Sequence, residues 1–304
     1  MLYSKTAVIL LGVASSSVSA APAPRSCVKI TDADILNYAL TLEHLEDNFY
    51  RQGLANFTEA QFADAGFDST LYNNIRTISS DESAHVSFLT SALEAAGAVP
   101  VEACTYSFGV TDVNSFLVTA SILEGVGVSA YLGAAADIMS KAYLTAAGSI
   151  LTVESRHSSY LRATIDQKPF PQPFDAPLSL NQVFSLASLF ITSCPESNPP
   201  LPVMAFPVLA LDPTTPAPVT TGNTVTLQTP EYTLQPEHGE PHFYAAFIAV
   251  TGPTFVEAMP VEGGFTVEIP EGFAGQTYVV LTSGNEGVSD DTIAAGPAII
   301  EISN

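Results

Sequence analysis

The stretch VESRH, residues 153–157, repeats the arrangement found in DESAH, residues 81–85. In each stretch a glutamate stands three residues before a histidine. The whole chain has only five histidines among 304 residues, so two Glu–His pairs with the same spacing are stronger evidence of a shared role than one pair would be. Positions three apart on a helix share one face, roughly 5–6 Å apart at Cβ. A carboxylate and an imidazole at this spacing can therefore bind the same metal ion.

A pair of metal ions in a helical bundle needs two further carboxylates, one from each of two other helices. Glu43 and Glu124 lie in the middle of two other predicted helices. Each is followed seven residues later by a tyrosine, Tyr50 or Tyr131, so each half of the region reads Glu-x6-Tyr and then Glu-x2-His. The sequence therefore predicts two metal ions held by six residues: Glu43, Glu82, His85, Glu124, Glu154 and His157.

Two of these assignments have alternatives. Glu46 lies one turn from Glu43 and could be the ligand in its place, although the spacing to tyrosine favours Glu43. Tyr50 and Tyr131 are candidates for hydrogen bonds to the ligands, and tyrosines of this kind also serve simply as core residues. The competing interpretation of the whole set is a group of solvated surface residues. Because a buried carboxylate without a partner is costly, these side chains should face either a metal or water.

The first part of the chain has apolar residues at three- and four-residue intervals, as a helical bundle requires. Thr31 and Asp34 have the spacing of a capping box, which predicts the start of the first helix, and that helix should stop before Gly53. The remaining helices are expected at 69–96, 112–138, 141–165 and 180–193. The predicted architecture is a four-helix bundle with a fifth helix.

Three glycines, Gly125, Gly127 and Gly133, interrupt the predicted helix at 112–138. Each interior glycine costs up to about 1 kcal/mol relative to alanine. Close packing of helices is the favoured explanation. The alternative is space beside Glu124 for a small substrate.

Composition changes near residue 195, from helix-forming residues to Pro, Thr, Val and Gly. Residues 21–198 are expected to form the bundle, and the proline-rich stretch 199–218 a linker. Short alternating runs then predict an antiparallel β-sandwich over 219–304, similar to immunoglobulin and fibronectin domains in architecture. The expected strands are 224–228, 242–250, 265–269, 277–282 and 298–302.

The N-terminal residues 1–20 have the pattern of a secretory signal peptide, with one lysine, an apolar core and small residues at the end. We expect a secreted protein, extracellular or bound to a cell wall, with no membrane anchor. The net charge of −22 argues against nucleic acid as a partner and is compatible with cations.

Secretion permits a disulfide. Three cysteines allow one pair and one left over, and the sequence weakly favours Cys104 with Cys194 over pairs that include Cys27. Asn56 begins the sequence Asn-Phe-Thr and is the expected glycosylation site.

These motifs resemble the ferritin-like di-metal carboxylate superfamily. Secretion, the fifth helix and LTLEHLEDNFY, residues 40–50, make the chain similar to secreted ferritin-like proteins of fungi. Those proteins are related to plant desiccation-associated proteins and are often named for stress or sexual development. The resemblance implies a four-helix bundle with two iron or manganese ions, and chemistry with dioxygen or peroxide.

Two functions remain open from the sequence. The first is a secreted di-metal protein, with oxidase or peroxide-handling activity. The second is a non-enzymatic stress or developmental protein with a vestigial metal site, in which the β-domain binds an unidentified partner. Redox turnover by metal-loaded protein would distinguish them.

Overall fold

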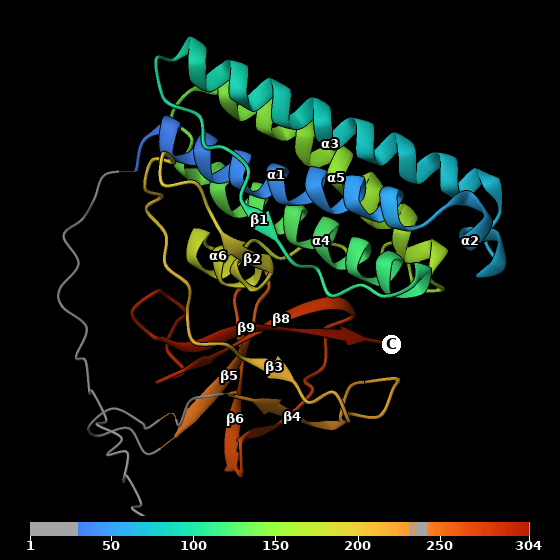
Figure 1. Cartoon of the computed structure of the whole chain (residues 1–304). Coiled ribbons are helices and arrows are strands. Elements are labelled where there is room, and N and C mark those ends of the chain that lie inside the picture. Colours follow the sequence, from blue (N-terminus) through green and yellow to red (C-terminus); the bar gives the residue numbers. More distant parts are fainter. Residues whose placement is uncertain (1–29, 231–233, 235–241, 304) are drawn as a thin grey trace, which may run out of the picture.

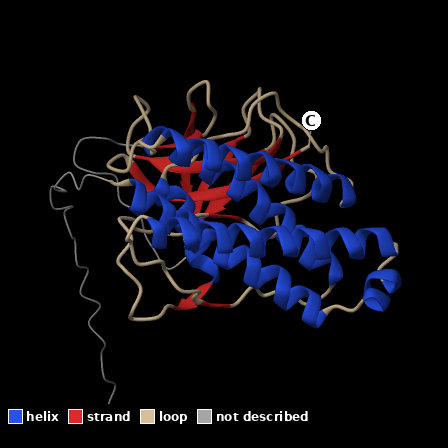
Figure 2. Cartoon of the chain, turned by 90° about the horizontal axis from the view of Figure 1, so that it is seen from above, coloured by secondary structure: helices blue, strands red, loops and turns tan. Residues whose placement is uncertain are grey.

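A computed structural model describes residues 30–230, 234 and 242–303. A layer of helices lies on an antiparallel sheet, and the chain passes from the first to the second through a long irregular segment (Figure 1). Seen from above, the helices run roughly alongside one another across the sheet (Figure 2). The predicted signal peptide and Cys27 lie outside the described residues.

Four long helices form the bundle, in which α1 packs against α3 and α4 against α5. The short α6 lies between the bundle and the sheet (Figure 1). The helices are α1 Asp32–Asn56, α2 Glu59–Asp64, α3 Ser69–Ala95, α4 Val113–Ala134, α5 Lys141–Thr164 and α6 Leu180–Ala187, with 3-10 turns η1 Ala135–Asp137 and η2 Ser188–Phe190. The four-helix bundle with an additional helix is confirmed.

The start of α1 is as predicted, since Thr31 and Asp34 form a capping box. The predicted stop before Gly53 was wrong, because the helix continues through it. A Cβ on Gly53 would lie 2.1 Å from Cε2 of Phe116, so the glycine allows a ring of α4 to contact the backbone of α1. The helix α2, six residues long with a capping box that begins at Thr58, was not predicted from the sequence.

The strands form a two-stranded pair and a larger antiparallel sheet in the order β3-β4-β7-β6-β5-β8-β9. The strands are β1 Thr105–Tyr106, β2 Ile191–Ser193, β3 Ala210–Leu211, β4 Thr224–Gln228, β5 Phe243–Phe247, β6 Thr254–Val261, β7 Gly264–Glu268, β8 Gly275–Thr282 and β9 Ile293–Ile302. The larger sheet curls, because Val219, close to its β3 end, bridges to Ile302 at the opposite edge. It encloses its own apolar core, which includes Phe247 and Leu281.

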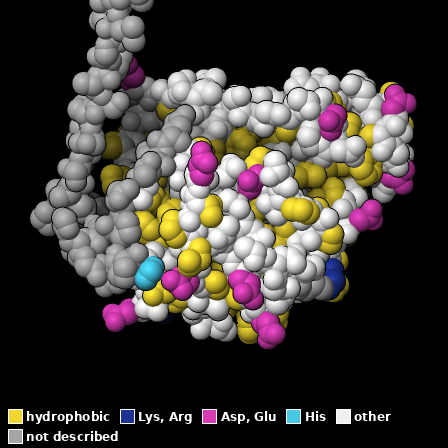
Figure 3. All heavy atoms as spheres, turned by 90° about the horizontal axis from the view of Figure 1, so that it is seen from below, with side chains coloured by type: hydrophobic (Ala, Val, Ile, Leu, Met, Phe, Trp, Pro, Cys, Tyr) yellow, Lys and Arg dark blue, Asp and Glu magenta, His cyan; other side chains and the backbone are white. Residues whose placement is uncertain are grey.

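Two details of this region differ from the prediction. The strand β3 lies inside the stretch that was expected to be a linker, and it pairs with β4. The strand β6 was missed because its sequence, TFVEAMPV, contains a proline and exposed side chains and therefore lacks a clear alternation. The exposed face of this sheet shows scattered acidic side chains and few basic ones, in keeping with the acidic composition (Figure 3).

The sheet and the bundle are joined by polar contacts as well as by apolar packing. Tyr278 of β8 donates a hydrogen bond of 2.8 Å to the carbonyl oxygen of Gly125 in α4. A Cβ on Gly125 would lie 2.7 Å from the side chain of Gln276, so this glycine lets β8 approach the helix. Arg162 of α5 makes two hydrogen bonds, of 3.0 and 2.7 Å, to Glu301 of β9. The sheet therefore covers one face of the bundle.

The segment Val113–Asp137, which comprises α4 and η1, is long and apolar enough to cross a membrane by length and composition. From the sequence we expected no membrane anchor. In the structure 67% of its most apolar window is buried inside the protein. Its hydrophobicity is that of a core helix between α5, α1 and the sheet.

A disulfide joins Cys104 to Cys194, the pair that the sequence favoured. The cysteines lie beside the β1–β2 pair, in which Thr105 is paired with Ser193. The bond thus ties the segment between α3 and α4 to the segment that follows α6.

We expect Cys104→Ser to lower the free energy of unfolding by about 2–5 kcal/mol, because the bond closes a long loop of the unfolded chain. Denaturant unfolding of the purified protein measures this. Cys27→Ser is the control and should leave the unfolding midpoint unchanged. Equal midpoints for Cys104→Ser and the parent protein would contradict a stabilising role for the bond.

Candidate metal centre

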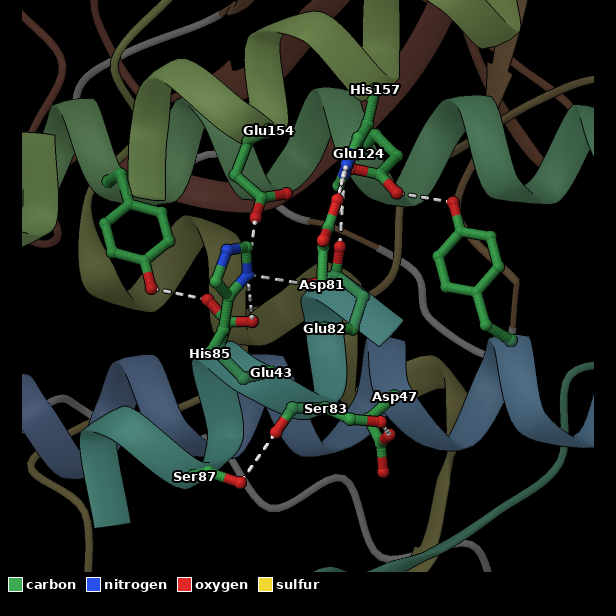
Figure 4. A network of polar contacts seen from close by, with 12 residues as sticks. Glu43, Asp47, Asp81, Glu82, Ser83, His85, Ser87, Glu124, Glu154 and His157 are labelled. Atoms are coloured by element: carbon green, nitrogen blue, oxygen red, sulfur yellow. Dashed lines mark hydrogen bonds and ion pairs between the residues drawn. The ribbon is translucent and has the colours of Figure 1, made fainter. Parts of the chain in front are cut away.

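The six residues singled out in the sequence converge in the middle of the bundle (Figure 4). The four long helices all contribute, α1 and α4 with one glutamate each, and α3 and α5 with a glutamate and a histidine each. All six are buried, and the four glutamates are 0% exposed: Glu43, Glu82, Glu124 and Glu154. The interpretation of these side chains as solvated surface residues is therefore wrong.

The cluster consists of two overlapping groups. Within each group, one ligand atom from every residue lies within 4.8 Å of the others. The first group adds Glu43 and His85, and the second adds Glu124 and His157, to the same two carboxylates. Those shared carboxylates are Glu82 and Glu154, the glutamates of the two Glu-x2-His motifs. Two neighbouring cations that share ligands would require this arrangement, in which two groups of ligand atoms have two carboxylates in common.

The ring of His85 directs Nδ1 into the first group. This atom lies 3.1 Å from Oε2 of Glu82, 3.2 Å from Oε2 of Glu43 and 3.2 Å from Oε1 of Glu154. A single ring nitrogen cannot form good hydrogen bonds with three carboxylates, because it carries at most one proton. The contacts instead show that Nδ1 of His85 and one oxygen from each of the three carboxylates surround one small volume.

Both ring nitrogens of His157 lie close to carboxylates. Its Nδ1 lies 3.1 Å from Oε1 of Glu82 and 3.3 Å from Oε2 of Glu124. Its other nitrogen, Nε2, lies 3.2 Å from Oδ2 of Asp81. A carboxylate at that distance accepts the Nε2 proton, so that in the neutral imidazole the lone pair of Nδ1 would face the cluster, which is how histidine ligands of metals are commonly oriented.

The two tyrosines hydrogen-bond to members of the cluster. Tyr50 donates to Oε1 of Glu124, and Tyr131 donates to Oε1 of Glu43 at 2.5 Å. The pattern is crossed, because each tyrosine contacts the glutamate of the other helix rather than the one seven residues before it. These bonds fix one oxygen of each carboxylate and leave the other facing the cluster.

Several polar atoms of the cluster are buried without a hydrogen-bond partner among the described residues. They are Oε1 of Glu82, Oε2 of Glu124, both carboxylate oxygens of Glu154 and Nδ1 of His157. Buried polar groups in proteins are nearly always paired, so a set of orphans facing one another requires an explanation. Four carboxylates and two imidazoles are the donors that iron and manganese take in helical bundles. The residues present therefore fit a pair of such ions.

The electrostatics of the cluster without metal are unfavourable. Burial, followed by the neighbouring charge of Glu154, raises the pKa of Glu82 to about 7 despite the lowering effect of the two histidines. Burial also raises the pKa values of Glu124 and Glu154. Burial alone would lower the pKa of His157, but its contacts with Glu124 and Glu82 outweigh this and raise it to about 11. Only protons or other cations can compensate so many acids.

Glu46 is a further member that the sequence offered only as a substitute for Glu43. The structure buries both, with Glu46 5% exposed. A Cβ on Gly127 would lie 3.1 Å from Oε1 of Glu46 and 3.1 Å from Oε2 of Glu154, so both carboxylates face this glycine. Burial, followed by the charge of Glu154, raises the pKa of Glu46 well above its ordinary value. The carboxylate is thus held beside the six-residue cluster.

The three glycines of α4 have different neighbours. Gly125 accommodates the sheet, and a Cβ on Gly133 would lie 1.7 Å from the carbonyl oxygen of Leu178. Close packing accounts for both, although against the sheet and a loop rather than against another helix. Gly127 alone faces the carboxylates.

An open groove of about 480 Å³ leads to the histidine side of the cluster, between α3 and α5. His85 and His157 lie along it, together with Asp81, Arg156 and Tyr160. The groove gives polar molecules a direct approach from solvent.

Asp81 was missed by the sequence analysis, although it begins the quoted stretch DESAH. An aspartate next to a glutamate on a helix points to a different side, and only the arrangement of α3 and α5 in the bundle brings Asp81 to His157. A further contact outside the cluster joins Ser83 to Asp47, at 2.6 Å, and Asp47 also pairs with Arg51. This contact links α1 to α3 beside the site (Figure 4).

Part of the chain is similar to two solved structures. One is described as a ferritin-like, diiron-carboxylate protein from Bacillus anthracis, with 17% identity, a TM-score of 0.38, and coverage of 44% of this chain and 94% of that one. The other is a conserved hypothetical protein from Mycobacterium tuberculosis, with 16% identity, a TM-score of 0.39, and coverage of 47% of this chain and 96% of that one.

The sequence is also similar to a curated protein and to a family of domains. Protein rds1 of the yeast Schizosaccharomyces pombe is 29% identical over 180 residues, which are 59% of this chain. The chain spans 44% of the length of that relative. This match agrees with the resemblance to fungal ferritin-like proteins. Residues 31–167, which contain all six members of the cluster, match the ferritin-like domain family. This helical part of the chain is therefore similar to ferritin-like domains.

Proposed function

We propose that the protein binds two metal ions, iron or manganese, in the bundle and uses them to handle peroxide or dioxygen. One observation carries the proposal: two groups of four ligand atoms share Glu82 and Glu154, and several of those atoms have no other partner among the described residues. In this proposal Glu82 and Glu154 would help to hold both ions. Glu43 with His85, and Glu124 with His157, complete the two positions.

The charge of the cluster supports two divalent ions. Four glutamates of the proposed set are fully buried, and no lysine or arginine among the described residues forms an ion pair with them. Four carboxylates balance two divalent cations when both histidines are neutral. The fifth buried carboxylate, Glu46, is left over and would remain protonated, in agreement with its raised pKa. A single divalent ion would leave two buried charges uncompensated, which is costly.

The protein side of the chemistry follows from the surroundings of the ligands. When bound, a pair of iron or manganese ions would supply one-electron redox steps, so that two electrons and two protons convert one hydrogen peroxide to two waters. The groove between α3 and α5 admits the polar oxidant from solvent. Asp81 holds His157 in the tautomer that binds through Nδ1. Tyr50 and Tyr131 keep two carboxylates oriented.

The setting of this activity is also part of the proposal. The signal-like residues 1–20 favour secretion. Asn56 is exposed at the end of α1, where a glycan would meet no obstacle from the bundle. The resemblance to fungal proteins named for stress favours a role in stress responses, and oxidants are a common form of stress at a cell surface.

We expect purified protein to carry about two iron or manganese ions per chain, and Glu82→Gln to reduce this to less than half, because the substitution removes a ligand common to both positions. Elemental analysis measures the metal content. Glu94→Gln, at an exposed position of the same helix, is the matched control and should retain full metal content. Metal-free wild-type protein after expression in medium with both metals would refute the proposal.

Metal binding should also depend on pH. Without metal, folded Glu82 holds its proton up to about pH 7, whereas the unfolded chain loses it near 4.5. The folded state binds more protons in this window, so the stability of metal-free protein should fall as pH rises through it. Metal replaces those protons, so the increase in Tm on metal addition should be larger at pH 7.5 than at pH 5.

Calorimetry of metal-free and metal-loaded protein at the two pH values measures this difference. Glu82→Gln should weaken the pH dependence of the metal-free protein, and Glu94→Gln should not. A metal-induced shift in Tm that is the same at both pH values would contradict proton–metal competition in the cluster.

A further inference from the structure

A second hollow reaches the cluster from the side opposite the groove. It has a volume of about 90 Å³ and lies where α1 and α4 meet α6, η2 and β9. Among the residues that line it, only Glu46 has a polar side chain. The others are Leu42, Leu45, Ile122, Leu123, Val126, Gly127, Leu186, Ala187, Leu189, Phe190 and Ile299.

The inner end of this apolar cavity is the boundary with the cluster. Glu46 and Gly127 line the cavity, and the missing side chain of Gly127 leaves Oε1 of Glu46 and Oε2 of Glu154 facing the same position. Any larger residue at 127 would place a Cβ only 3.1 Å from both oxygens. The glycine therefore keeps an opening where a helix would otherwise form a wall.

The outer end opens to solvent at Leu189 of η2, whose side chain is 56% exposed. Deeper in the cavity, Leu186 and Ala187 of α6 are buried. Ile299 of β9 contributes from the sheet, so the cavity wall is completed by elements outside the four long helices. The cavity thus runs from an apolar surface position to a carboxylate beside the cluster.

We propose that this cavity is a binding pocket and access route for a small apolar molecule of the dioxygen class, separate from the polar groove that serves peroxide. The inference rests on the proposed function, since it assigns a substrate route to the same centre. An apolar cavity of about 150 Å³ stays dry and takes up xenon or benzene. At about 90 Å³, this one suits a diatomic gas or a xenon atom and is too small for a larger ring.

The groove and the cavity differ in the molecules they favour. Asp81, Arg156 and the two histidines make the groove polar and wet, which suits hydrogen peroxide. Transfer of an uncharged apolar gas from water into an apolar cavity is favourable, whereas a polar molecule would lose its hydrogen bonds there. The two routes should therefore respond to different substitutions.

The first test needs no metal. Crystals of metal-free protein under xenon pressure should show xenon in the cavity of the wild type. Ala187→Ile, which fills the cavity, should abolish that site. Absence of xenon from the wild-type cavity would overturn the proposal, whether or not the protein binds iron.

The second test compares two oxidants on Fe(II)-loaded protein by stopped-flow absorbance. Ala187→Ile should slow oxidation by dioxygen about fivefold or more and leave oxidation by hydrogen peroxide within about twofold of the wild type. Equal slowing with both oxidants, or no slowing with either, would overturn the separate route. Failure to load any iron would instead refute the proposed function and leave the xenon result standing.

Because a larger residue at 187 could disturb packing, a surface variant provides a second route to the same answer. Leu189→Trp should cover the mouth and slow only the reaction with dioxygen. Leu144→Trp, at a similarly exposed position of α5, is the matched control and should change neither rate. Equal rates with dioxygen for these two variants would show that the mouth at Leu189 is not used.

Discussion

The constraint on which the structure depends is the burial of five carboxylates in the centre of a helical bundle. Each would be unfavourable there without a cation or a proton. Their positions are nevertheless fixed by the apolar residues around them, because α1, α3, α4 and α5 pack through one shared core. The free energy of the apolar core holds the acids together, and the acids in turn form a cluster whose donor atoms fit cations. Stability and function are thus in opposition until metal or protons occupy the cluster.

The fused sheet determines how the cluster can be reached. One side of the bundle, formed by α1 and α4, is covered by β8, β9 and α6. The opposite side, between α3 and α5, is open to solvent. Tyr278 and the Arg162–Glu301 pair hold the sheet in place. The same covering layer supplies Ile299 and Ala187 to the apolar cavity. The β-domain therefore has a structural consequence for the site, independent of any partner that it could bind.

Much of the cluster could be predicted because helical spacing is a local property. Glu82 with His85, and Glu154 with His157, must share a helix face wherever the helices lie. The repeat of Glu-x6-Tyr indicated which glutamates belong with them. The positions of Asp81 and Glu46 could not be derived in this way. Whether Asp81 meets a histidine depends on how α3 and α5 lie in the bundle, and Glu46 has space beside Glu154 because Gly127 has no side chain. The short strand β3 and the helix α2 were missed because too few residues form them to give a periodic signal.

The internal repeat also explains how the two halves of the bundle are held in register. Tyr50 follows Glu43 on α1 but hydrogen-bonds to Glu124 on α4, and Tyr131 follows Glu124 but hydrogen-bonds to Glu43. A sliding movement of α1 along α4 would break both bonds at once, so the pair of tyrosines fixes the relative height of the two glutamates. The repeat is broken at two points only recognisable in three dimensions. The first is Asp81, which contacts Nε2 of His157, whereas no described residue makes an equivalent contact to Nε2 of His85. The second is Glu46, which lies next to Glu154 and follows Glu43 by three residues. The equivalent position on α4, three residues after Glu124, is Gly127. The two groups of ligand atoms are therefore inequivalent, and Gly127, which stands where a second carboxylate would be, lines both the cluster and the apolar cavity.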